Sequence, residues 1–130
     1  MLACMPSLQD TFLRLRPDCT VELLQADGFW PRLMAGELGD FHREYLVTTS
    51  AFTASWTSWE RHPLGDEIVC LLSGHVTLVQ ETPVGAVRIE MDRPGQFAVN
   101  PRGTWHTADV HAESLMLFIT AGEGTEGRPR

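Results

Sequence analysis

The chain has 130 residues, of which 43% are hydrophobic and 21% are charged, a size and composition typical of one globular domain. Ten Lys and Arg against 17 Asp and Glu give a formal net charge of −7. Because nucleic-acid backbones are bound by clustered Lys and Arg, and no basic run occurs, we expect no nucleic-acid partner. The apolar runs are too short to span a bilayer, so no membrane partner is expected either.

The cysteines do not form a recognisable framework. Cys4, Cys19 and Cys70 are odd in number and have no close pair, which argues against a set of disulfides or a zinc finger. No apolar segment precedes Cys4, so the opening MLAC is not expected to be a lipoprotein cleavage site. A reducing, cytoplasmic location is the expectation.

The first element along the chain is expected to be a short helix over residues 6–16 (PSLQDTFLRLR). Ser7 is a suitable N-cap, and Leu8, Phe12 and Leu15 fall on one helical face. Pro17 ends the segment. A helix of this length is most simply packed outside a sheet.

The rest of the chain is expected to be built from strands. VELLQ (residues 21–25) precedes a Gly- and Pro-punctuated stretch, 27–40, which favours an irregular loop or an edge strand. Eight short segments rich in β-branched or aromatic residues then follow, divided by turn residues: 44–52, 53–60, 66–73, 75–81, 86–92, 96–100, 106–110 and 114–120. This pattern predicts an all-β antiparallel barrel or sandwich. We therefore divide the chain into a helical extension packed on the barrel (1–40), the barrel (41–121) and a flexible tail (122–130).

Four ionisable residues are the candidates for a functional site. Glu60 and His62 are two residues apart, so on a strand they project from the same face. A Pro-Leu-Gly turn follows, and Glu67 then begins an apolar strand. Farther along, a Pro-x-Gly turn leads directly into a strand that begins near His106.

These two regions resemble the two motifs of the cupin superfamily. The first motif runs Gly, five residues, His-x-His, three or four residues, Glu, six residues, Gly, and it is matched at His62, Glu67 and Gly74. The second runs Gly, five residues, Pro-x-Gly, two residues, His, three residues, Asn, and the residues in register with it are Gly95, Pro101, Gly103 and His106. The motifs cover about 50 residues (59–110). The resemblance implies a double-stranded β-helix, or jelly-roll, barrel.

The chain departs from the motifs at three positions. Glu60 stands at the first His, Ala54 at the opening Gly and Val110 at the terminal Asn. In the family, the motif His and Glu residues converge on one metal ion inside the barrel. Carried over, the resemblance implies a metal cluster of Glu60, His62, Glu67 and His106.

Two imidazoles and one carboxylate are the ligand set of a facial triad for Fe²⁺ and similar ions. Glu60 would then be a fourth ligand or an unbound general base. A divalent transition metal is expected, with iron, manganese, zinc and nickel all possible. In the alternative interpretation the barrel has lost its metal, and Glu60 forms a buried ion pair with His62.

Two tryptophans are candidates for lining a cavity. Trp56 shares a strand face with Glu60 and His62, although an ordinary core tryptophan fits the pattern equally well. Trp105 precedes His106 and could form a wall for a substrate, or simply pack at the turn.

Together these features indicate a metal-dependent enzyme that acts on a small molecule, with oxygenase- or isomerase-like chemistry. The alternative is a non-catalytic barrel that binds or senses a small ligand. The barrel strands are apolar on both faces, and an edge strand leaves backbone groups unpaired unless another element covers it. A homodimer, which would cover such surface, is therefore expected.

Overall fold

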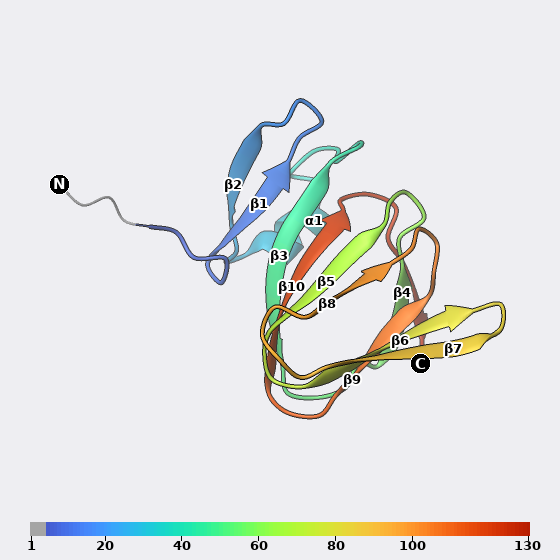
Figure 1. Ribbon diagram of the computed structural model, residues 1–130. Helices are drawn as coiled ribbons and strands as arrows, with labels where there is room; N and C mark the ends of the chain where they lie inside the picture. Colours follow the sequence, from blue (N-terminus) through green and yellow to red (C-terminus); the bar gives the residue numbers. More distant parts are fainter. Residues whose placement is uncertain (1–4) are drawn as a thin grey trace.

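The computed structural model describes residues 5–130 and consists of two antiparallel sheets packed face to face (Figure 1). The larger sheet has six strands, in the order β2 (Val21–Gln25), β1 (Thr11–Leu15), β3 (Tyr45–Phe52), β10 (Ser114–Ala121), β5 (Glu67–Ser73) and β8 (Phe97–Asn100). The smaller has five, in the order β11 (Glu126–Pro129), β4 (Ser58–Arg61), β9 (His106–Val110), β6 (Val76–Thr82) and β7 (Gly85–Met91). This arrangement confirms the predicted all-β jelly-roll barrel.

The main core lies between the sheets and follows from the alternation of side chains along each strand. In β10, for example, Met116 and Phe118 point inward and are buried, while Leu117 and Ile119 on the opposite face are half-buried. Residues from both sheets complete this core: Val69, Leu71, Val76, Leu78, Met91, Ala98 and Ala108. This core occupies only part of the space between the two sheets, and a cavity occupies another part.

The N-terminal region differs from its prediction. Residues 11–15 form strand β1, which pairs with both β2 and β3, so the helix expected over 6–16 is wrong. Only one turn of 7–11 remains helix-like, with the Thr11 amide donating to the Ser7 carbonyl (2.8 Å). The short helix lies instead at α1 (Phe29–Met34), inside the Gly- and Pro-rich stretch expected to be a loop or edge strand. Pairing with two neighbouring strands outweighed the weak local helical pattern.

A second, smaller core anchors this extension. Phe12, Leu24, Phe29, Phe41 and Leu46 are buried together, and the rings of Phe12 and Phe29 meet edge to face at 5.1 Å. The extension therefore joins the larger sheet through β1 and β2 and closes one end of the barrel with α1.

The C-terminal segment also differs from its prediction as a flexible tail. Residues 126–129 form β11, which pairs with β4 along its whole length. Arg61 and Glu126 form an ion pair across these strands, 2.6 Å apart. In the smaller sheet β4 lies between β9 and β11. Without β11, the outer edge of β4 would have no hydrogen-bonding neighbour.

Within the described chain, Cys19 and Cys70 are free thiols, while Cys4 lies outside the described residues. No helix in residues 5–130 has the length and apolar character needed to cross a membrane.

Candidate metal centre

Cross-strand pairing positions three of the four predicted site residues. In the smaller sheet, Glu60 of β4 lies directly opposite His106 of β9. In the larger sheet, Glu67 of β5 lies directly opposite Asn100 of β8. Paired residues share a face of their sheet, and both pairs face the interior between the sheets.

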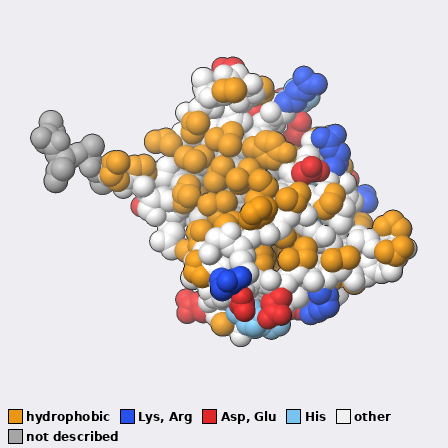
Figure 2. Space-filling model, in the orientation of Figure 1, with side chains coloured by type: hydrophobic (Ala, Val, Ile, Leu, Met, Phe, Trp, Pro, Cys, Tyr) orange, Lys and Arg blue, Asp and Glu red, His pale blue; other side chains and the backbone are white. Residues whose placement is uncertain are grey.

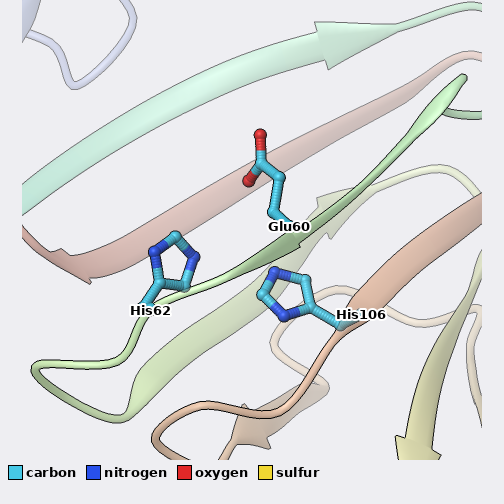
Figure 3. Close-up of side chains that lie close together, drawn as sticks. All are labelled: Glu60, His62 and His106. Atoms are coloured by element: carbon cyan, nitrogen blue, oxygen red, sulfur yellow. The ribbon is translucent and has the colours of Figure 1, made fainter. Parts of the chain in front are cut away.

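The fourth residue, His62, follows β4 and enters the turn that carries the chain from the smaller sheet to Glu67 in the larger one. Its carbonyl accepts a hydrogen bond from the Gly103 amide (3.1 Å), which ties this turn to the Pro-x-Gly turn before His106. The His62 and His106 side chains are 4% and 0% exposed. Figure 3 shows their rings side by side, beneath the Glu60 carboxylate.

The structure brings all four predicted residues together. Glu60, His62 and His106 each offer a ligand atom, and these atoms lie within 4.8 Å of one another. The Glu67 carboxylate lies between the rings, with Oε2 at 3.1 Å from Nε2 of His62 and Oε1 at 3.1 Å from Nε2 of His106. With metal–ligand bonds of about 2.1 Å, neighbouring ligand atoms in an octahedral shell are about 3.0 Å apart.

Both imidazoles are held by their other nitrogen. Nδ1 of His106 lies 3.2 Å from the Thr104 carbonyl oxygen, and since a carbonyl only accepts, Nδ1 carries the proton in this contact. Nδ1 of His62 lies 3.0 Å from the Thr125 hydroxyl. The carbonyl contact fixes the tautomer of His106, whereas the Thr125 hydroxyl, which can donate or accept, fixes the orientation of the His62 ring. Contacts of this kind direct the Nε2 atom of a metal-binding histidine at the ion.

The inward-facing nitrogens provide a test of whether a metal fits. Nε2 of His62 and Nε2 of His106 are buried and make no hydrogen bond, although each is close to a Glu67 oxygen. A lone pair on neutral His106 would face a carboxylate there, which is repulsive. A cation between these atoms removes the repulsion, so the donor set fits a divalent ion.

Residues around Glu67 were missed by the sequence interpretation. Asn100 donates to Glu67 Oε1 (3.0 Å) and Thr120 donates to Oε2 (2.6 Å). Gln80 in turn donates to Asn100 Oδ1 (2.8 Å). Strand alternation places these polar residues on inward faces, but only the pairing of distant strands shows that they meet at Glu67.

The electrostatics of the cluster follow from burial and mutual contact. Burial and, secondarily, the charge of Glu67 raise the pKa of Glu60. Burial alone would raise the pKa of Glu67, but without a metal the contacts of its carboxylate with Nε2 of His106 and of His62, when these rings are protonated, outweigh burial and hold that pKa well below its usual range. Burial opposes the charge on His62, yet Glu67 and Glu60 outweigh it and raise the pKa of His62. Glu67 is therefore ionised, and Glu60 retains its proton to a higher pH than an exposed glutamate.

A cavity of about 430 Å³ opens beside the cluster. Glu60, His62 and Glu67 lie in its wall, as does Trp56, one of the two tryptophans considered as lining residues. Trp105 is not part of this wall. Its ring instead lies against the guanidinium groups of two arginines, Arg61 at 4.6 Å and Arg128 at 4.4 Å.

Of the two interpretations of Trp105, the structure therefore favours packing, against Arg61 and Arg128, over a wall of this cavity. Glu60, His62 and Trp56 share one face, as period-two geometry predicts, and the intervening Arg61 points the other way. Trp105, directly before the buried His106, faces outward for the same reason.

No family model matches the sequence, and no curated protein matches it. Among solved structures, a hydroquinone 1,2-dioxygenase from Sphingomonas sp. TTNP3 with bound 4-hydroxybenzoate matches with a TM-score of 0.50 and 20% identity, over 62% of this chain and 60% of that one. An oxalate oxidase in complex with the substrate analogue glycolate matches with a TM-score of 0.53 and 17% identity, over 63% and 45% of the two chains. A cupin-2 domain protein from Shewanella frigidimarina matches at 0.48 and 17%, over 66% and 71%.

The dioxygenase and the oxalate oxidase, with TM-scores of 0.50 and 0.53, belong to the cupin superfamily. The chain has the cupin fold. The likeness covers about three fifths of this chain and 60% or less of the dioxygenase and oxidase chains. The four clustered residues are the ones to which the resemblance in the sequence assigned the metal site.

Proposed function

We propose that this cupin-fold chain is a metal-dependent enzyme that acts on a small molecule. The observation that carries the proposal is the pair of buried Nε2 atoms, of His62 and His106, that make no hydrogen bond and face the carboxylate of Glu67. Buried polar atoms rarely lack a partner. Two of them beside one carboxylate support a coordination shell that a metal ion would complete.

In this proposal His62, Glu67 and His106 hold one divalent transition ion. The ion, when bound, supplies Lewis-acid or redox chemistry to a substrate in the cavity. Asn100 and Thr120 fix the orientation of the Glu67 carboxylate through their hydrogen bonds. Such supporting contacts commonly change metal affinity by about 10–100-fold when removed.

Glu60 completes the set, either as a fourth ligand or as the group that moves a proton. Its position in the cavity wall allows contact with a bound molecule. Because burial raises its pKa, Glu60 is closer than an exposed carboxylate to the range in which general acids and bases operate. A group that moves a proton beside a metal is suited to isomerase-like reactions and to oxygenase-like reactions that include a proton transfer.

The test is a metal analysis of protein purified without chelator. We expect a divalent transition ion at a substantial fraction of one per chain. His106→Ala should abolish it, because this change removes the ligand from β9. His75→Ala is the matched control, since His75 lies at the surface against Glu90 and its loss should leave the metal content unchanged.

If His106→Ala holds as much metal as the parent, the proposed centre is wrong. If the metal is confirmed, a screen for oxygen consumption with candidate substrates separates an oxygenase from an isomerase or a non-catalytic binding barrel. The neighbours with the same fold include a dioxygenase and an oxidase, so oxidative reactions are the first to examine. A chain that binds metal and ligands but turns over nothing would be a binding or sensing barrel.

We also propose that two copies associate through the outer face of the larger sheet. One register row crosses all six strands with aliphatic side chains only: Leu23, Leu13, Val47, Ile119, Ile68 and Val99. Leu23 and Val99, at its two ends, are 59% and 44% exposed. Figure 2 shows the broad hydrophobic patch that results.

The occupant that suits this patch best is a second copy of the chain. The row is buried at Val47 (6% exposed) and exposed toward its two ends, where Phe97 (64% exposed) of β8 extends it. An exposed apolar patch of several residues on a monomer is often functional. Chains with a net charge of −7 repel one another over most of their surface, and this row carries no charge to oppose pairing.

A further inference from the structure

One part of the cavity wall is aromatic. Phe52, Trp56 and Phe118 all line the cavity and are in mutual contact, with ring centroids 5.6, 6.1 and 6.2 Å apart. The Trp56 ring also meets the imidazole of His106, at 6.3 Å between centroids. Since aromatic rings associate offset or edge to face at such separations, a flat ring placed here finds complementary surface beside the candidate metal centre.

Hydroxyl groups lie between the apolar parts of the wall. The inward face of β3 presents Leu46, Thr48, Ser50 and Phe52 in succession, and all four line the cavity. The Thr48 and Ser50 hydroxyls can each donate to or accept from a ligand oxygen. A cavity of about 150 Å³ is enough for benzene, so the 430 Å³ here accommodates a ring with polar substituents.

The wall contains no fixed cation. Among the described residues that line the cavity there is no Lys and no Arg, whereas Glu60 and Glu67 are both present. A bound divalent ion would be balanced in formal charge by these two carboxylates. An anionic ligand would therefore lose its hydration beside two glutamates, and no Lys or Arg of the wall would compensate with a permanent positive charge.

We infer that the cavity binds a small, neutral, hydroxylated aromatic molecule and discriminates against carboxylates. The inference rests on the proposed function for the role of the cavity as the substrate site. The preference itself comes from the wall, where three aromatic rings and two hydroxyls are present and a cation is absent. It is therefore measurable with or without metal.

Two matched pairs of probes test the two parts of the inference on the full chain at pH 7. Benzamide and benzoate have the same shape but differ in charge, while phenol and cyclohexanol both carry a hydroxyl but differ in aromaticity. Binding is measured by amide chemical-shift titration of ¹⁵N-labelled protein, both metal-free and loaded with Zn²⁺. We expect benzamide to bind at least tenfold more tightly than benzoate, and phenol at least fivefold more tightly than cyclohexanol, with the largest shifts near Ser50, Phe52 and Phe118.

A gain-of-function variant tests the role of charge. Ser50→Lys adds a cation to the wall and should reduce or reverse the preference for benzamide over benzoate. Thr53→Lys is the control, because Thr53 is exposed just beyond β3 and its variant has the same net charge. It should keep the parent's preference.

The inference is overturned if benzoate binds the parent chain as tightly as benzamide in both metal states, or if the shifts map away from the cavity. Zn²⁺-dependent binding of benzoate that exceeds benzamide binding would also overturn it, while leaving the metal proposal intact. Conversely, a chain that takes up no Zn²⁺ but prefers benzamide and phenol would refute the proposed function and uphold the preference of the cavity. Should Ser50→Lys fail to fold, the two probe pairs on the parent chain still decide the question.

Discussion

Glu60 and His106 lie directly opposite each other on the neighbouring antiparallel strands β4 and β9. On the other side of β4, Gly127 of β11 is paired with Glu60. Glu60 is thus held in the middle of three hydrogen-bonded strands, and its side chain must leave the sheet on the same face as His106. The one ligand position at which the chain departs from the cupin motifs is therefore held by strand pairing on both sides.

The first prediction concerns Glu60. Replacing it by Gln removes a carboxylate from the group formed with His62 and His106, and a neutral amide is a poorer ligand for a divalent ion. We expect Glu60→Gln to weaken metal affinity by about 10–100-fold, measured by titration of the metal-free protein with Mn²⁺ or Zn²⁺.

Unchanged affinity together with lost turnover would instead assign Glu60 to proton transfer. Glu60→His is the companion variant. It restores the three-histidine set of the family and should bind metal at least as well as the parent, with a shift toward Zn²⁺ or Ni²⁺.

A second prediction concerns self-association. Leu23→Glu places a charge at the exposed end of the apolar row, at a distance from the candidate metal centre, and should convert a dimer at micromolar concentration to a monomer in sedimentation experiments. Val87→Glu is the control, because Val87 is 43% exposed but lies on β7 of the smaller sheet. A parent chain that sediments as a monomer, or a dimer that survives Leu23→Glu, contradicts the proposed interface.

A third prediction concerns the turn between β5 and β6. Gly74 has a φ of +100°, and a Cβ there would lie 2.2 Å from Ser114 Oγ and 2.5 Å from the Glu113 carbonyl oxygen. Gly74→Ala should therefore destabilise the protein by about 2–4 kcal/mol, since the strain of the backbone conformation and the clash add together.

Gly85→Ala isolates the contribution of backbone strain, because Gly85 has a φ of +120° but nothing within 4 Å of the added Cβ. Its cost should be smaller, about 1–2 kcal/mol. Urea unfolding followed by tryptophan fluorescence measures both. Equal costs for the two variants would show that the close approach to Ser114 relaxes freely.

A fourth prediction concerns acid stability. Contacts with Arg130 and then Arg88 hold the pKa of Asp109 below its usual range. A depressed folded-state pKa stabilises the protein above the unfolded-state pKa of about 3.9, and this contribution is lost as the pH falls through the folded-state value. Asp109→Asn should thus be less stable than the parent near pH 6, by on the order of 1 kcal/mol.

That difference in the free energy of unfolding should shrink as the pH is lowered from about 5 toward 2, because the parent loses its ion pairs there. Arg130→Ala should reproduce only part of this pH dependence, because Arg88 still contacts Asp109. It should also remove the hydrogen bonds that Arg130 donates to the Trp56 and Ala108 carbonyl oxygens, each at 3.2 Å. A difference that does not vary with pH would mean that the carboxylate charge of Asp109 does not stabilise the fold.

Most of the strands and the members of the cluster could be predicted from the sequence alone. VELLQ and HTADV are strands with the predicted bounds, because alternation and turn residues act over a few neighbouring positions. The same local geometry places Glu60 and His62 on one face, and the resemblance to the cupin motifs is what added Glu67 and His106 to them.

Only the tertiary structure decided the features that depend on pairing between distant segments. Residues 11–15 became a strand because β2 and β3 lie on either side of them, and residues 126–129 because the edge of β4 was open. Asn100 and Thr120 reach Glu67 from positions 33 and 53 residues away. Local sequence determines the periodicity of the side chains in a helix or strand and the types of its turns. The pairing of strands depends on which faces the whole chain must bury. The contacts around the buried carboxylate of Glu67 follow from that pairing.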